Sequence, residues 1–180
     1  MEMYFIALIA PEKINQRVLK WKLWMQEKFQ CQAALKSPAH ITLIPPFWMQ
    51  PELENELHHS IDEFSVTQNP ISIQLNGFSC FKPKVLYVNV EINEALNNLK
   101  DLLEQFLIQK EKFRLSREDR SFQPHVTIAT RDLHKKAFYE AWDHFKKINY
   151  SAEWIADGIS VLKHNKKNWD VLFTSQFQSV

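Results

Sequence analysis

Apolar and polar positions along the chain follow two kinds of spacing, and each predicts a type of element. Apolar runs and period-two alternation predict strands over residues 4–10, 39–45, 71–75, 85–92, 122–130, 154–162 and 169–177. Apolar positions three and four apart predict helices after Pro11, from Pro51, around Leu96 and from Asp132. Asn76-Gly77 and the polar residues 164–168 are predicted turns.

The predicted elements repeat in the same order. Strand, helix, strand, helix and strand occur twice, and one extra strand follows at the end. His125 holds in the second half the place that His40 holds in the first. The repeat predicts one domain over 1–180 made of two similar lobes, about 1–80 and about 81–180, with a cleft between them.

Composition narrows the possible functions. A chain of 180 residues with 45% hydrophobic and 24% charged residues is typical of a globular domain. The formal net charge of +1 does not favour a protein that coats long nucleic acid. Gly77 and Gly158 are the only glycines, which excludes a Walker loop and a dinucleotide-binding fingerprint, since both need clustered glycines.

Cysteine usage and hydropathy indicate the compartment. Cys31 and Cys80 form neither a disulfide framework nor a metal-ligand spacing, and we interpret them as free thiols in a reducing compartment. No segment approaches the ~20 apolar residues of a membrane span. The apolar run from Met3 to Ala10 is short and follows Glu2, so it is interpreted as a strand rather than a signal peptide. We expect a cytoplasmic protein.

The chemistry is expected in two similar tetrapeptides, His40-Ile41-Thr42-Leu43 and His125-Val126-Thr127-Ile128. Residues two apart in a strand point to the same face, so each segment presents one imidazole beside one hydroxyl and turns its apolar residues into the core. If the lobes face each other, two imidazoles and two hydroxyls surround one cavity.

That set of groups suits a phosphodiester. One neutral imidazole takes a proton from the attacking hydroxyl or water, and the protonated partner gives one to the leaving oxygen, each contributing about 10²–10⁴-fold. The threonine hydroxyls can donate to the phosphoryl oxygens where charge develops. The alternative interpretation is purely structural: both histidines are core residues whose ring nitrogens hydrogen-bond to backbone carbonyls. It does not explain why the His-x-Thr pairs recur at matching positions.

At these residues the chain resembles the 2H phosphoesterase superfamily, in its 2'-5' RNA ligase-like and cyclic phosphodiesterase branch. Segments 39–43 and 122–129 are close to the two family signatures. The resemblance implies an α+β fold of two pseudo-symmetric lobes with mainly antiparallel sheets facing across a central cleft. It also implies that His40 and His125 are the catalytic acid and base, that Thr42 and Thr127 hold the phosphate, and that no metal or cofactor takes part. The implied substrate is a nucleotide cyclic phosphate or an RNA terminus, and we expect a monomer that does not bind membranes.

The chain departs from the family pattern beside both motifs. An arginine often follows the alanine of the second signature, whereas here Thr130 takes that place and Arg131 comes one residue later. A shift of one residue in a strand would turn Arg131 to the other face. After the first motif Ile44-Pro45-Pro46-Phe47 replaces a glycine-containing turn.

Other polar and aromatic groups are weaker candidates for the site. Glu54 and His58 are four apart on a predicted helix beside His59, but no third metal ligand lies nearby, so an exposed helical face explains them better. The remaining candidates are basic residues that could bind phosphate but are more often solvated, and aromatic residues that could stack on a base but are more often core. They are Arg114, Arg117, Arg120, Lys163, Lys166, Lys167, Phe47, Trp48, Phe122 and Trp169.

Two other functions remain open from the sequence. One is a nucleotide- or RNA-binding module that keeps the cleft but does not turn over, which tight binding without product would reveal. The other is a non-enzymatic scaffold with buried histidines, which a bell-shaped pH profile would exclude. The pattern does not decide which histidine is the base.

Overall fold

A computed structural model describes residues 1–117 and 121–178. The strands are β1 (Glu2–Ile9), β2 (His40–Met49), β3 (Ile71–Phe81), β4 (Val85–Val90), β5 (His125–Ala129), β6 (Ser151–Ala156), β7 (Gly158–His164) and β8 (Trp169–Gln176). The helices are α1 (Glu12–Phe29), α2 (Glu54–Ser65), α3 (Glu94–Gln109) and α4 (Lys135–Phe145), with short 3₁₀ turns η1 (Ala33–Lys36), η2 (Pro51–Leu53) and η3 (Glu111–Phe113).

The strands form two four-stranded antiparallel sheets. The first sheet has the order β2-β1-β7-β8 and the second the order β5-β4-β3-β6. The expected α+β fold with mainly antiparallel sheets is therefore confirmed. Each sheet takes strands from both halves of the chain, so the expected boundary near residue 80 does not separate the two sheets.

The predicted strand over 154–162 is two strands. The chain leaves the second sheet after Ala156 and enters the first at Gly158. A Cβ at Gly158 would lie 2.7 Å from the backbone oxygen of Ser175, so the backbone of β8 approaches more closely than a side chain allows. The backbone N–H of Phe177 donates to the oxygen of Asp157 at 2.7 Å and closes this crossing point.

The turn predicted at Asn76-Gly77 is instead a bulge inside β3. The register with β4 shifts between Leu75 and Phe78, and Gly77 has φ +66°. Glycine adopts this left-handed conformation without the steric cost of a Cβ, so the strand bends and continues to Phe81.

Some predicted boundaries also move. β2 continues through Pro45 and Pro46 to Met49 because it is an edge strand, where a missing N–H is tolerated. β5 spans only His125–Ala129, and α4 begins at Lys135 rather than Asp132. Pro51 begins the 3₁₀ turn η2, and α2 follows it from Glu54.

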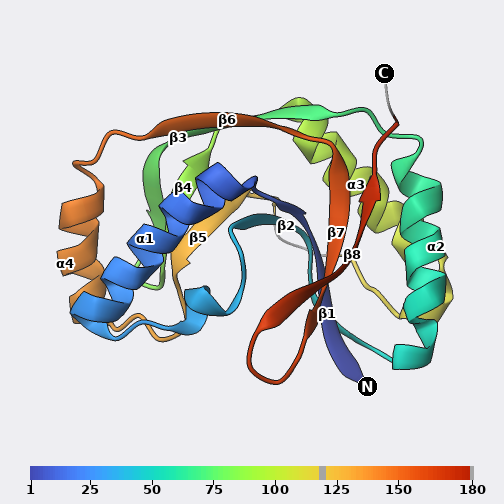
Figure 1. Cartoon of the computed structure of the whole chain (residues 1–180), viewed down its shortest axis with the longest axis horizontal. Helices are drawn as coiled ribbons and strands as arrows, with labels where there is room; N and C mark the ends of the chain where they lie inside the picture. The colour runs from blue at the N-terminus through green and yellow to red at the C-terminus, as the bar shows by residue number, and fades with distance from the viewer. Residues whose placement is uncertain (118–120, 179–180) are drawn as a thin grey trace.

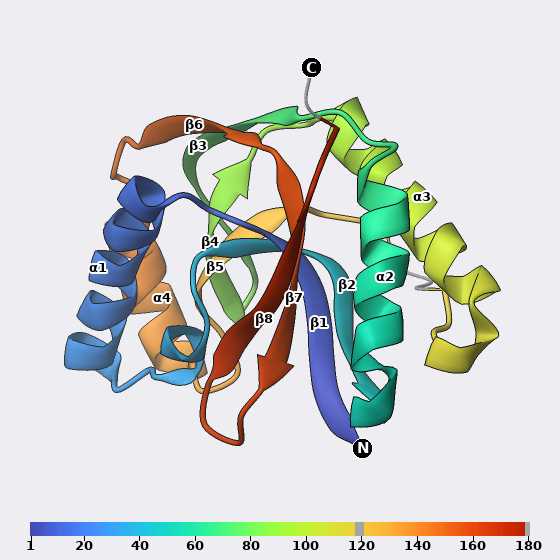
Figure 2. The same cartoon turned by 45° about the vertical axis from the view of Figure 1, so that its right-hand side comes forward.

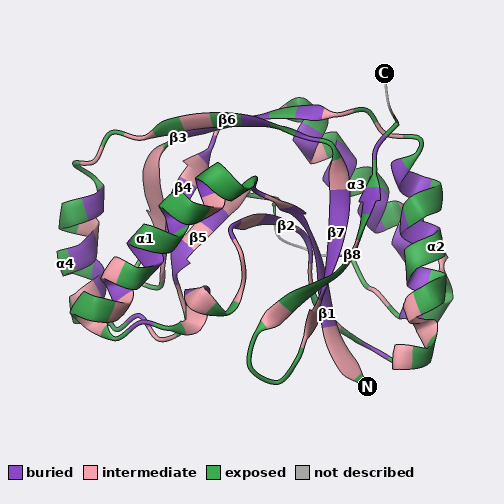
Figure 3. Ribbon diagram, in the orientation of Figure 1, coloured by how far each residue is buried: buried purple, intermediate pink, exposed green. Residues whose placement is uncertain are grey.

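Helices α1 and α3 cross between the sheets, whereas α2 and α4 each pack on the sheet of the strand that precedes them. α1 follows β1 of the first sheet but packs against β5 of the second, and α4 packs against β4 (Figure 1). α3 follows β4 of the second sheet but packs against β2 of the first, and α2 packs against β7 and β8. Buried residues line the inner faces of these helices (Figure 3), and most of them form one continuous cluster. This exchange ties the two halves into one core.

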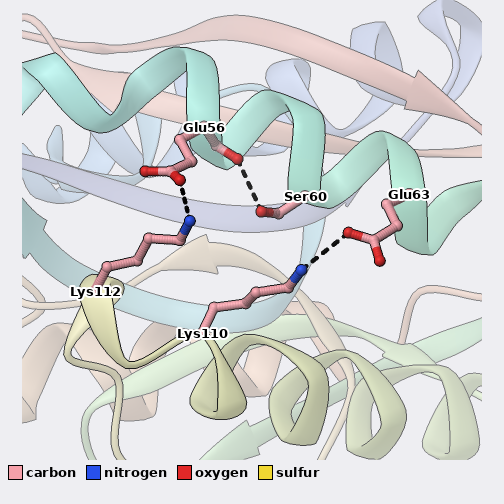
Figure 4. Close-up of polar contacts among 5 residues, drawn as sticks. All are labelled: Glu56, Ser60, Glu63, Lys110 and Lys112. Atoms are coloured by element: carbon pink, nitrogen blue, oxygen red, sulfur yellow. Dashed lines mark hydrogen bonds and ion pairs between the residues drawn. The ribbon is translucent and has the colours of Figure 1, made fainter.

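Polar contacts join α2 to Lys110, the residue after α3, and to η3 (Figure 4). Lys110 Nζ donates to Glu63 Oε2 at 2.9 Å, and Lys112 pairs with the Glu56 carboxylate. The Ser60 hydroxyl donates to the Glu56 backbone oxygen at 2.8 Å. Exposed pairs of this kind contribute about 1 kcal/mol or less, so apolar packing carries most of the helix–helix contact.

Among residues 1–117 and 121–178, we find no helix with the length and apolar character that crossing a membrane requires.

Candidate active site

The two His-x-Thr motifs open the two edge strands β2 and β5. In each strand the histidine and threonine are half-buried, whereas Ile41 and Val126 have no exposed surface. This confirms the alternation expected from the sequence. The two strands lie side by side at the centre of the molecule (Figure 2), with Cα atoms of one within 8 Å of Cα atoms of the other. The fold thus brings together two motifs that are far apart in the sequence.

Both imidazoles are oriented by their own backbone. Nδ1 of His40 lies 2.7 Å from the oxygen of Pro38, and Nδ1 of His125 lies 2.7 Å from the oxygen of Gln123. A carbonyl oxygen can only accept, so Nδ1 carries the hydrogen in both rings and Nε2 keeps its lone pair. Each ring therefore has a nitrogen ready to accept a proton.

A first cavity of about 580 Å³ lies against one motif and part of the other. His40, Thr42 and Thr127 line it together. Its volume lies within the range of small-ligand sites. The walls also include Lys36, Arg131, Asp132, His164 and Trp169.

A second cavity of about 630 Å³ adjoins the first and contains the other histidine. His125 lines it with Phe81, Lys100 and Phe122, and Thr42 lines both cavities. The Lys100 ammonium is paired with Glu104 Oε2 at 3.0 Å. The shared Thr42 lies where the two cavities meet, so a ligand contacting this hydroxyl can extend to either side.

Both histidines favour the neutral form. Burial lowers the pKa of His40 to about 4, against the hydrogen bond to Pro38, and the positive charges of Lys22 and protonated His125 lower it further. Burial also lowers the pKa of His125, against its hydrogen bond to Gln123. A bound phosphate reverses part of this effect because its negative charge favours an imidazolium.

Arg131 lines the first cavity, which corrects the expectation that it faces away from the site. β5 ends at Ala129 and Arg131 adopts φ 38°, so the alternation of a strand no longer applies at this position. Next to it, Asp132 Oδ2 accepts from the backbone N–H groups of Gln32 at 2.6 Å and Ala33 at 2.9 Å. These hydrogen bonds hold the segment that carries Arg131 against the start of η1.

The sequence did not single out His164 as part of the site. Rings connect it to the first motif: Phe5 lies 4.8 Å from His40 and 4.7 Å from Trp169, and Trp169 lies 4.9 Å from His164, between ring centroids. The hairpin between β7 and β8 thus reaches the cleft from the other end of the chain. A lone histidine at the start of a predicted turn gives no signal of such a contact.

Of the four aromatic candidates, two line the cavities: Trp169 the first and Phe122 the second. Phe47 packs against Tyr4, with ring centroids 6.1 Å apart, and Trp48 is 57% exposed. Neither lies in the wall of these cavities.

Most of the other basic candidates lie outside the two cavities. Lys163 is paired with Glu2 and Glu54, and Lys166 and Lys167 are exposed in the last hairpin. Arg114 caps η3, the exposed Arg117 lies 4.0 Å from Glu104, and Arg120 lies outside the described residues.

The possible metal ligands on α2 are engaged in other contacts. Glu54 Oε1 accepts from Tyr4 at 2.6 Å and from Lys163 at 2.8 Å, while His58 stacks on Phe173. Over 1–117 and 121–178 no group of three or more His, Cys, Asp or Glu side chains is placed to hold a metal ion.

The sequence model of the 2'-5' RNA ligase superfamily matches residues 10–168. The chain belongs to this superfamily. The match covers both motifs and confirms the family resemblance seen at the two signatures. A protein of Geobacillus sp. strain WCH70, named "Putative phosphoesterase", is 25% identical over 161 residues, which are 88% of this chain and 86% of that protein.

Solved structures share the fold. TT0787 of Thermus thermophilus has a TM-score of 0.70 and 17% identity, with 98% of each chain covered. LigT of E. coli, in complex with 3'-AMP, has a TM-score of 0.70 and 16% identity, with 99% of each chain covered. At these identities the structures support the arrangement of sheets and helices.

Proposed function

We propose that this protein cleaves or transfers a phosphodiester of a nucleotide or RNA end without a metal, using His40 and His125 as acid and base and Thr42 and Thr127 as phosphate ligands. The observation that supports this most strongly is the shared orientation of the two imidazoles at adjoining strand ends, where each Nδ1 is hydrogen-bonded to a backbone carbonyl and the Nε2 lone pair is left as the proton acceptor.

The chemistry follows from this arrangement. In hydrolysis of a cyclic phosphate, one neutral imidazole takes a proton from water while the water oxygen forms a bond to phosphorus. The bond from phosphorus to one ribose oxygen breaks, and the second imidazole, protonated, gives its proton to that oxygen. The threonine hydroxyls and Arg131 stabilise the charge on the phosphoryl oxygens, an effect worth about 10²–10³-fold for one such donor.

A nucleotide suits the two cavities. Trp169 in the first cavity and Phe122 in the second are aromatic surfaces on which a base can stack. Among structures of the same fold, E. coli LigT has been solved with 3'-AMP, with ATP and with phosphate. Two Geobacillus relatives carry the name "Putative phosphoesterase". These findings support a nucleotide or RNA-end substrate.

The direct test is turnover of nucleoside 2',3'-cyclic phosphates and of 2'-5' linked oligonucleotides in the presence of EDTA. We expect product with EDTA, and a loss of at least about 10²-fold in kcat for His40→Gln and for His125→Gln. His59→Gln is the matched control, since His59 is exposed on α2, away from both cavities. Full activity in both active-site variants would refute the proposal.

A second candidate is a binding module without turnover. The lowered pKa of both histidines favours it to this extent: burial disfavours the protonated ring that has to act as the proton donor. Micromolar binding of 3'-AMP with no product from any of the phosphodiesters over a day would establish this alternative.

A further inference from the structure

Lys22 is a buried cation on α1 close to the first motif. Only 4% of its surface is exposed. In the part of the chain that the structure describes, no carboxylate pairs with it; its hydrogen bond goes to a backbone oxygen. A buried charge without a counterion is costly, so the fold keeps this ammonium at a considerable energetic cost.

The hydrogen bond of Lys22 connects it to His40 through the backbone of Ser37 and Pro38. Lys22 Nζ donates to the oxygen of Ser37 at 2.9 Å, and the oxygen of the next residue, Pro38, accepts from His40 Nδ1. A second residue of α1 also contacts this segment: the Asn15 side-chain oxygen accepts a hydrogen bond from the N–H of Ala39 at 2.8 Å. One helix thus fixes the three residues that precede His40.

The charge of Lys22 acts on the same ring. It lowers the pKa of His40, since a nearby cation disfavours an imidazolium. Burial lowers the pKa of Lys22 itself to about 8, so the ammonium remains the main form at neutral pH. In the second lobe burial lowers the pKa of His125 against its hydrogen bond to Gln123. Lys100 lines the same cavity as His125, but its ammonium is paired with Glu104 Oε2 at 3.0 Å. The two imidazoles therefore differ in their electrostatic surroundings.

We propose that Lys22 is a positioning residue of the active site, which holds the Ser37–Pro38 backbone that orients His40 and, through its charge, keeps this imidazole as the proton acceptor of the free enzyme. His125, whose neighbouring Lys100 is paired with Glu104, is then the proton donor once an anionic substrate binds. The inference rests on the proposed function for its catalytic consequence, although the effect on His40 exists without turnover.

Other charged groups around His40 do not replace Lys22. Lys36, Arg131, Asp132 and His164 also line the first cavity. Lys36 and Arg131 are exposed to solvent, which screens their charges, and Asp132 is bound to backbone N–H groups of η1. Protonated His125 acts on His40 in the same direction as Lys22, so the titration of both rings has to be followed together.

The test is NMR titration of the histidine Cε1 signals in wild type, Lys22→Met and Lys22→Arg, with Lys20→Met as the control. Lys20 lies on the same helix and is exposed. We expect Lys22→Met to raise the midpoint of His40 by about 0.5–1 pH unit, with His125 nearly unchanged. Lys22→Arg should retain the low midpoint and Lys20→Met should leave both unchanged. An unmoved His40 midpoint in folded Lys22→Met would overturn the proposal.

Wild type supplies a second measurement that needs no variant. The Cε1 signal of His40 should show a further inflection near pH 8, where Lys22 loses its proton, and the signal of His125 should not. Absence of that inflection counts against the proposal even if Lys22→Met does not fold.

Kinetics separate positioning from general stability. Lys22→Met should lower kcat/KM and move the acid limb of its pH profile upward, and Lys22→Arg should restore the wild-type limb. If the role of Lys22 were purely structural, its replacement would lower the maximum of kcat/KM without moving the acid limb of the pH profile. If His40→Gln and His125→Gln remained fully active while the titration behaved as expected, the function proposed above would fail and the electrostatic role of Lys22 would stand.

Discussion

His40 and His125 are held in the same way although they belong to different sheets: each Nδ1 lies 2.7 Å from the carbonyl oxygen two residues earlier in its own chain. The contact forms where the chain enters each strand, although the accepting residues differ, Pro38 in one and Gln123 in the other. Both rings therefore turn Nε2 away from the backbone, and this makes a paired acid–base function possible.

The lowered pKa values predict an acidic optimum. A base must be neutral and an acid protonated, so activity requires a pH above the pKa of the base and below that of the acid. The pKa of His40 is about 4 and that of His125 lies below the usual 6.5. We expect kcat/KM on a nucleoside cyclic phosphate to peak between about pH 4 and 6.5; an optimum above pH 8 would contradict the assignment.

Stability should depend on pH through the same ring. The pKa of His40 is about 4 in the folded chain and near 6.5 when unfolded, so the unfolded state binds more protons between these values. Stability is therefore complete above about pH 6.5 and falls as the pH drops toward 4, by about 3 kcal/mol at most. Urea unfolding at pH 4.5 and 7 should show a smaller difference for His40→Gln than for wild type. An equal difference in both would show that other groups cause the acid sensitivity.

Removing either threonine hydroxyl should slow turnover without unfolding the protein. Valine has nearly the shape of threonine and suits a strand, so Thr42→Val and Thr127→Val remove mainly the donor. We expect kcat to fall about 10-fold to 10³-fold in each, with Tm changed by only a few degrees. Thr67→Val is the control, because Thr67 lies beyond the end of α2, where its hydroxyl contacts the oxygen of Phe64. Unchanged kcat in both strand variants would remove the threonines from the mechanism.

Arg131 should contribute to binding of the phosphate. It lines the first cavity beyond the end of β5, so we expect Arg131→Gln to raise KM for an anionic substrate about 10-fold, as loss of a charged hydrogen bond does. Arg114→Gln serves as the comparison, since Arg114 caps η3 outside both cavities. Equal KM values for Arg131→Gln and wild type would show that Arg131 does not contact the substrate.

Gly158 should be intolerant of any side chain. A Cβ there would meet the Ser175 oxygen at 2.7 Å, and both are strand backbone, so we expect Gly158→Ala to cost about 1–3 kcal/mol. Gly77→Ala has open space but φ +66°, and it should cost about 1–2 kcal/mol through the left-handed conformation. Urea midpoints give both values, and a fully stable Gly158→Ala would mean that β7 and β8 can separate at this crossing.

The sequence predicts the elements and the motifs well because their signals are local. Alternation places Thr42 beside His40, and the same holds for the second motif. What escapes prediction depends on contacts between distant segments. The crossing at Gly158, which moves the chain from one sheet to the other, looks like an uninterrupted strand because both sides are apolar.

The rest of the site could not be predicted for the same reason. His164 and Trp169 enter it because β7 and β8 pair with β1, and Arg131 enters it because the chain turns after Ala129. From the pattern of apolar positions along α1, Lys22 could be either exposed or buried. Only the packing of α1 across the sheets buries it beside the first motif.

The most direct test of the central claim is a crystal structure with a nucleoside 3'-monophosphate bound. We predict that Nε2 of His40 and Nε2 of His125 both lie within hydrogen-bond distance of oxygens on one phosphorus atom, with the Thr42 and Thr127 hydroxyls on the remaining oxygens. A phosphate bound by one histidine alone, or bound away from β2 and β5, would contradict the account.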